Sequence, residues 1–294
     1  MIDRRAILAV SVWLWAIWLF SPASAADTDT PSEETAQSAT FTYHREVLAN
    51  YELISEEGIS DEHHDKMLRY LRWVEKYAEE HLGFAATGKI TVIFTKERTF
   101  RDYTGANAHI NGLFDGRIHL PTFLPEEQET LFKSVLLHEY THAAARELSA
   151  GACPKWVEEG FTEYAESTLG PRENPTLGRY VAARGELPYT WDAIDNIFDN
   201  ILTAEPVKVE LAYAQSYAAV AGLYANYSKR QLRTFLEKIG RLHDVEKALD
   251  GAFGISYVGL TRLALRHSAP ATITPKKHPK KRGAATLVSQ PPKR

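Results

Sequence analysis

The most informative stretch of the sequence runs from His138 to Tyr164 and reads "HEYTHAAARELSAGACPKWVEEGFTEY". It opens with the pattern His-Glu-x-x-His, formed by His138, Glu139 and His142. Residues four apart lie on one face of a helix, and Leu131 and Val135 continue this face toward the N-terminus. The two imidazoles therefore stand where core side chains are expected, and their nitrogens need partners.

A metal ion would provide a partner for one nitrogen of each imidazole. Glu139 is next to the first histidine, where it can reach an activated water without binding the metal itself. The pattern therefore predicts one zinc ion per chain, held by His138 and His142, with Glu139 as the general base.

The third metal ligand is not determined by this motif. A third histidine in the metzincin pattern is excluded, since Ala145 and Leu148 occupy the positions that this pattern reserves for glycine and histidine. The other solution is a glutamate from the following helix. Four glutamates of "WVEEGFTEYAE" are candidates, namely Glu158, Glu159, Glu163 and Glu166.

The combination "HEYTH…WVEEGFTEY" resembles the gluzincin metallopeptidases, and more closely the bacterial peptidase-MA-like group. The resemblance extends over roughly residues 90–265. It implies that Glu159 is the third zinc ligand and that Glu163 orients a ligand histidine. It also implies that Tyr213, in "AYAQSYAAVAGLY", stabilises an oxyanion. A buried aromatic role for Tyr213 remains the alternative, because Tyr213, Tyr217 and Tyr224 have helical spacing.

The same resemblance implies a zincin-like α+β fold. A small mixed sheet would pack an edge strand on the histidine helix, and a mainly helical C-terminal subdomain would follow. The edge strand would be "RIHL", residues 117–120, and would bind an extended peptide substrate by strand addition. Glu158 stands where aminopeptidases of this clan carry asparagine, and an amine-anchoring motif is missing. The resemblance therefore does not define the cleavage preference.

Periodicity predicts strands first and helices later, which is an α+β order. Strands are expected within 41–54 and 89–94, with a hairpin over 111–121 that turns at Asp115-Gly116. Helices are expected at 60–82, 97–103, 126–148, 157–169, 211–227, 229–239, 245–253 and 257–267.

The chain divides into four segments. Residues 1–26 have a basic start, an apolar run and a small-residue end, which predicts a cleaved signal peptide and a secreted or periplasmic protein. An uncleaved N-terminal membrane anchor is the alternative. Residues 27–38 read as a linker, and residues 39–270 as the peptidase domain, with an upper part at 39–149 and a lower helical part at 150–270. Residues 271–294 read as a disordered basic tail.

The charge distribution limits the partners. The whole chain carries −4 and the two terminal segments together carry +8, so residues 27–270 carry −12. This acidic body argues against a nucleic acid partner. The basic tail is either a solvated segment or a contact with an anionic envelope surface. The single cysteine, Cys153, excludes an intramolecular disulfide, and the sequence leaves the oligomeric state undetermined.

The sequence therefore predicts a secreted zinc peptidase. Two alternatives remain: a non-catalytic zinc-bearing domain that binds a protein or an envelope partner, and a structural protein in which the histidine motif is accidental.

Overall fold

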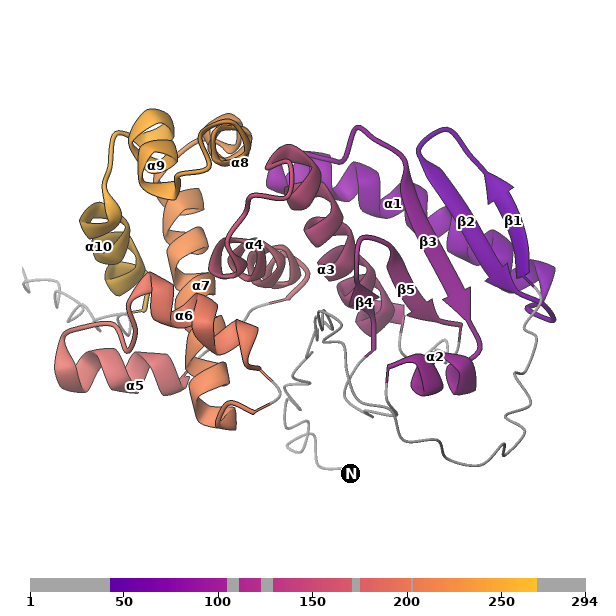
Figure 1. Ribbon diagram of the computed structural model, residues 1–294, viewed down its shortest axis with the longest axis horizontal. Helices are drawn as coiled ribbons and strands as arrows, with labels where there is room; N and C mark the ends of the chain where they lie inside the picture. The colour runs from indigo at the N-terminus through magenta and orange to yellow at the C-terminus, as the bar shows by residue number, and fades with distance from the viewer. Residues whose placement is uncertain (1–42, 105–110, 123–128, 171–174, 202, 269–294) are drawn as a thin grey trace, which may run out of the picture.

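The computed structural model describes residues 43–104, 111–122, 129–170, 175–201 and 203–268, and within them the chain is an α+β protein with a small mixed sheet (Figure 1). The sheet has the strand order β1-β2-β3-β5-β4. Its strands are β1 (Tyr43–Val47), β2 (Tyr51–Glu56), β3 (Ile90–Thr95), β4 (Leu113–Phe114) and β5 (Ile118–Pro121). Strands β2, β3 and β5 are parallel, whereas β1 and β4 are antiparallel to their neighbours.

The hairpin over 111–121 forms as predicted, but its second strand is not at the edge of the sheet. Strand β5 pairs with β3 on one side and with β4 on the other, so the prediction that residues 117–120 form the edge strand is wrong. The physical reason is burial, because all four residues of β5 are buried and a central position covers them on both sides. The edge strand of this half of the sheet is β4.

Two helices pack on the inner face of the sheet, where Leu53, Val92, Ile118 and Leu120 are fully buried. Helix α1 (Asp61–Leu82) begins as predicted, because the Ser60 side chain accepts a hydrogen bond from the third residue of the helix. Helix α3 (Glu129–Leu148) carries the histidine motif, and α2 (Glu97–Tyr103) lies beside β3 and β5.

The second half of the described chain is helical. It contains α4 (Lys155–Ser167), α5 (Pro175–Arg184), α6 (Trp191–Asp199), α7 (Pro206–Asn226), α8 (Lys229–Leu242), α9 (Val245–Phe253) and α10 (Tyr257–Ser268). The short helices α5 and α6 are not among those predicted from sequence. Helix α4 lies between α3 and α7, α5, α6, α8 and α10 contact α7, and α9 packs on α8 (Figure 1). The α3–α4–α7 layer therefore joins the sheet to the helical half.

The predicted signal peptide, the linker and the basic tail lie outside the described residues. In the part of the chain that the structure describes, no helix combines the length and apolar character that crossing a membrane requires.

Candidate metal centre

The two histidines lie on a helix that is buried on nearly every side. From Leu136 to Ala145, each residue of α3 is buried, and His138 and His142 are each 1% exposed. The i, i+4 spacing turns both rings toward α4, where Glu159 is 4% exposed. A helix of this kind has no solvent face to receive polar side chains, so each of these three groups needs a partner inside the protein.

The three side chains converge on one point. Nε2 of His138 and Nε2 of His142 are 3.2 Å apart. The Oε2 atom of Glu159 lies 4.0 Å from the first nitrogen and 3.8 Å from the second, and it has no hydrogen-bond partner among the described residues. These atoms fit one metal ion, since tetrahedral bonds of about 2.0–2.1 Å space ligand atoms roughly 3.3 Å apart. Two imidazoles and a carboxylate are a donor set that suits zinc.

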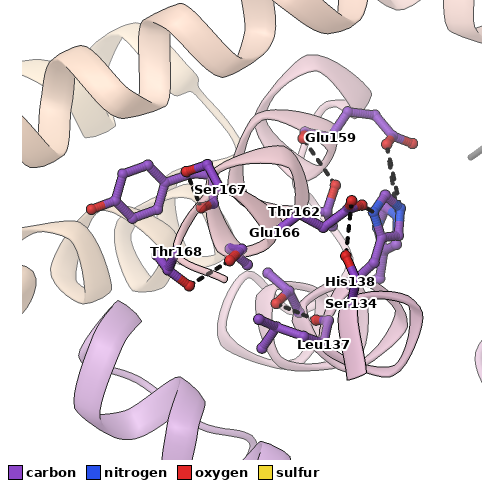
Figure 2. A network of polar contacts seen from close by, with 12 residues as sticks. Ser134, Leu137, His138, Glu159, Thr162, Glu166, Ser167 and Thr168 are labelled. Carbon is purple, nitrogen blue, oxygen red and sulfur yellow. Dashed lines mark hydrogen bonds and ion pairs between the residues drawn. The ribbon is translucent and has the colours of Figure 1, made fainter. Parts of the chain in front are cut away.

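A second carboxylate orients the first histidine (Figure 2). The Nδ1 atom of His138 lies 2.5 Å from Oε1 of Glu166, and the Ser134 hydroxyl donates to the other oxygen of that carboxylate at 3.2 Å. A carboxylate accepts, so Nδ1 carries a proton, and in the neutral ring Nε2 has its lone pair for a metal. The resemblance assigned this orienting role to Glu163. A carboxylate oxygen of Glu163 lies within 4.8 Å of a ring nitrogen of His138 and of a carboxylate oxygen of Glu166.

The role of Glu166 was missed, although the helical period contains a signal for it. Glu159, Glu163 and Glu166 are spaced i, i+4 and i+7 on α4, so all three lie on the side that meets α3. From the sequence, Glu166 was only one of four candidate ligands. The Ser134 hydroxyl on α3, one turn before His138, is the feature that only the packing of the two helices reveals.

Burial and neighbouring charge shift the pKa values of these groups. Burial disfavours the charged form of His138, but the hydrogen bond and charge of Glu166 outweigh it and raise the pKa of His138 to about 10. Burial raises the pKa of Glu159 to about 8, against the opposing charge of His138. Burial and the charge of His138 hold the pKa of His142 well below its usual range. Without an ion, the site therefore holds protons where a metal would bind.

Glu139 lies beside the three converging groups and against the edge strand. Its carboxyl is 3% exposed, and burial raises its pKa to about 7, with the charge of His138 opposing. The backbone of Gly112, just before β4, approaches so closely that a Cβ atom there would lie 2.9 Å from Glu139 Oε1 and 2.6 Å from Val135 Cγ1. Glycine is required at this position because any side chain would displace the carboxyl.

The end of the edge strand also contacts a histidine. The ring of Phe114, the last residue of β4, lies parallel to that of His142, with centroids 6.1 Å apart. This contact was not foreseen, because it depends on β4 being the outer strand of the hairpin. Strand β4 therefore runs along the metal centre, with Gly112 at Glu139 and Phe114 at His142.

Tyr213 lies on the face of α7 that meets α4. A Cβ atom on Gly160 would lie 2.7 Å from the Ser216 carbonyl oxygen and 2.6 Å from Val220 Cγ2, and Tyr213 is one turn before Ser216. Its ring is 3% exposed and meets Phe198 edge-on at 4.8 Å. The oxyanion role of Tyr213 stays a prediction.

His119 lies away from the metal centre and is buried. It is 6% exposed and stacks on Tyr103. Its position on β5 between Ile118 and Leu120, which point into the core, places its side chain on the opposite face of the sheet.

Residues 127–266 match the family model of the peptidase MA superfamily. This segment contains the histidine helix, the glutamate helix and Tyr213. This match agrees with the gluzincin resemblance of the sequence and supports a metallopeptidase of this kind. No curated protein matches the chain in sequence.

Proposed function

We propose that the protein is a secreted, zinc-dependent peptidase with a zincin-like arrangement of its helices and sheet. The observation that carries this proposal is the convergence of two buried imidazole nitrogens and one buried carboxylate oxygen, within 3.2–4.0 Å of one another, beside a second buried carboxyl. A structural role alone would leave the oxygen of Glu159 without a hydrogen-bond partner in the interior, which is costly.

His138, His142 and Glu159 would hold the ion, with Glu166 fixing the first imidazole. When bound, zinc supplies Lewis-acid chemistry and makes water a stronger nucleophile near neutral pH. Three protein ligands leave room for a small molecule in a four-coordinate site, which is the composition of catalytic rather than structural zinc sites.

Glu139 would act as the general base. It would take a proton from the attacking water and return it to the departing amine of the cleaved peptide bond. The Oε2 atom of Glu139 is buried and has no hydrogen-bond partner among the described residues, so its hydrogen-bonding capacity is unused. Tyr213 would donate to the oxyanion that develops on the peptide carbonyl.

The peptide substrate would lie along β4. An edge strand offers unpaired N–H and C=O groups to an extended chain, and β4 is the strand that borders the metal centre. Gly112 would place the backbone of the substrate next to Glu139. Residues 1–26 would be the export signal, with an uncleaved anchor as the alternative. Residues 271–294 would be a solvated basic tail, with a contact to an anionic envelope surface as the alternative.

Two measurements on the purified protein test this proposal. Elemental mass spectrometry after preparation without added metal should find about one zinc per chain. Hydrolysis of a peptide library should then be lost in Glu139→Gln, which keeps its zinc, and should persist in Glu129→Gln, a matched change at an exposed glutamate on the same helix.

The outcomes separate the candidate functions. Absence of zinc, even after zinc is offered at neutral pH, would refute the metal centre and favour a structural role for the histidines. One zinc per chain without hydrolysis of any peptide would favour the non-catalytic zinc-bearing domain. Full hydrolysis by Glu139→Gln would refute the general-base role.

A further inference from the structure

A cavity of about 320 Å³ lies on the outer face of the sheet, beside α2. This cavity, the sheet pocket, is lined by residues that include Ile54 of β2, Ile93 of β3 and His119 of β5. His119 points away from the core residues Ile118 and Leu120, so the sheet separates the pocket from the metal centre. The volume falls within the range of small-molecule sites, about 300–1,000 Å³.

The floor and one wall of the sheet pocket are apolar. Ile54 and Ile93 are half-buried on neighbouring parallel strands, and Phe100 of α2, 1% exposed, closes the wall. Such a surface favours an aromatic or branched aliphatic group, because burying apolar area is favourable by about 25 cal/mol per Å².

One end of the sheet pocket carries an oriented imidazole. The Asp115 carboxylate accepts hydrogen bonds from the Tyr103 hydroxyl at 2.7 Å and from the Arg117 backbone N–H at 3.1 Å. It also lies 3.1 Å from Nε2 of His119, whose ring stacks on Tyr103 with centroids 4.7 Å apart. The carboxylate must accept, so Nε2 carries the ring proton.

The other ring nitrogen of His119 is therefore an acceptor. Burial lowers the pKa of His119, although the charge of Asp115 opposes this, and the ring is neutral at pH 7. Among the described residues, no donor reaches Nδ1 of His119. A neutral imidazole held by a carboxylate and an aromatic ring is a fixed acceptor at the end of an apolar cavity.

We propose that the sheet pocket binds a small neutral molecule with an aromatic or branched aliphatic body and one hydroxyl or N–H group that donates to His119. Arg117 lies at the pocket with a side chain that is 53% exposed, and its guanidinium is 3.6 Å from the Asp115 carboxylate. Its charge is therefore partly balanced and in contact with water, which disfavours an anion as the ligand. The inference does not depend on the metal centre.

Three probes of similar size test the proposal by NMR titration of the isotope-labelled protein. Phenol has the ring and the donor, toluene has the ring without the donor, and benzoate has the ring with an anion. We expect phenol to shift the His119 ring signals and to bind at least about fivefold more tightly than toluene, since one hydrogen bond is worth about 1 kcal/mol. Equal binding of phenol and toluene, tightest binding of benzoate, or no binding of phenol would each overturn the proposal.

Variants place the ligand and separate binding from folding. Thr99→Trp on α2 fills the sheet pocket and should abolish phenol binding, whereas Arg98→Trp, whose side chain is 94% exposed and does not line the cavity, should leave it unchanged. If Thr99→Trp does not fold, His119→Phe provides the second test. This substitution keeps an aromatic ring at position 119, and Asp115 still accepts hydrogen bonds from the Tyr103 hydroxyl and the Arg117 backbone N–H. Phenol should then bind no better than toluene, and a retained preference for phenol would overturn the role of His119.

Discussion

Replacement of Gly160 by alanine tests the contact that holds the glutamate helix in place. Gly160 follows Glu159 at the point where α4 meets α7. An added Cβ would lie 2.6 Å from Val220 Cγ2, 2.7 Å from the Ser216 carbonyl oxygen and 3.1 Å from the carbonyl carbon. The valine side chain can rotate, but the carbonyl group belongs to the backbone of α7. The two helices must therefore separate, and Glu159 moves with α4.

The expected cost combines two opposing effects. Overpacking a close contact destabilises a protein by about 1–3 kcal/mol. Alanine is the better helix former by about 1 kcal/mol, which offsets part of that cost. We expect Gly160→Ala to lower the free energy of unfolding by up to about 2 kcal/mol, or the Tm by up to about 8 °C. Its zinc affinity should fall as well, because Glu159, one of the three proposed ligands, is displaced.

Urea unfolding of the metal-free protein measures the first effect, and zinc competition with a chelator measures the second. Gly178→Ala is the matched control, since Gly178 also lies inside a helix but its added Cβ would meet only the Ser268 carbonyl oxygen at 3.6 Å. That variant should be as stable as the parent, or more stable by up to about 1 kcal/mol. If Gly160→Ala matched Gly178→Ala in stability and zinc affinity, the close approach of α4 and α7 would be refuted.

Three further predictions concern the metal centre. Glu166→Gln should weaken zinc binding about 10–100-fold in chelator competition, because His138 loses the carboxylate that orients it, and unchanged affinity would exclude that role. His142→Ala should lose zinc and lower the Tm of protein prepared with zinc, and unchanged metal content would exclude His142 as a ligand. Zinc binding at pH 7 should release about two protons, since His138 and Glu159 have pKa values of about 10 and 8 without metal. Zinc affinity should therefore rise with pH, and calorimetry in buffers of different ionisation enthalpy should show this release; identical heats in all buffers would contradict it.

The histidine motif was readable from sequence because its geometry is local. Two residues four apart in any helix face the same side, so the spacing of His138 and His142 predicted a shared face, and the structure places their Nε2 atoms 3.2 Å apart. Helix α1 and the hairpin were predictable for the same reason. The capping residue Ser60 and the Asp115-Gly116 turn each determine the structure of the few residues next to them in the chain.

Local sequence did not determine which carboxylate orients His138. Glu163 and Glu166 lie on the same side of α4, and the sequence contains nothing that ranks one above the other. The choice depends on how far α4 is shifted along α3, which brings Glu166 rather than Glu163 within 2.5 Å of His138 Nδ1. That shift is set by side-chain packing between the two helices.

The order of the strands was likewise decided by tertiary structure. Local sequence patterns were enough to predict that a hairpin precedes the histidine helix, that two histidines and a glutamate share one helix, and that a glutamate-rich helix follows. It did not determine which strand of the hairpin faces outward, because both contain apolar residues and each pairing satisfies the same backbone groups. Pairing of β5 with β3, far apart in the chain, placed β4 at the edge, Gly112 against Glu139, and His119 on the opposite face of the sheet. Contacts between distant segments decided these features, and only the folded chain brings those segments together.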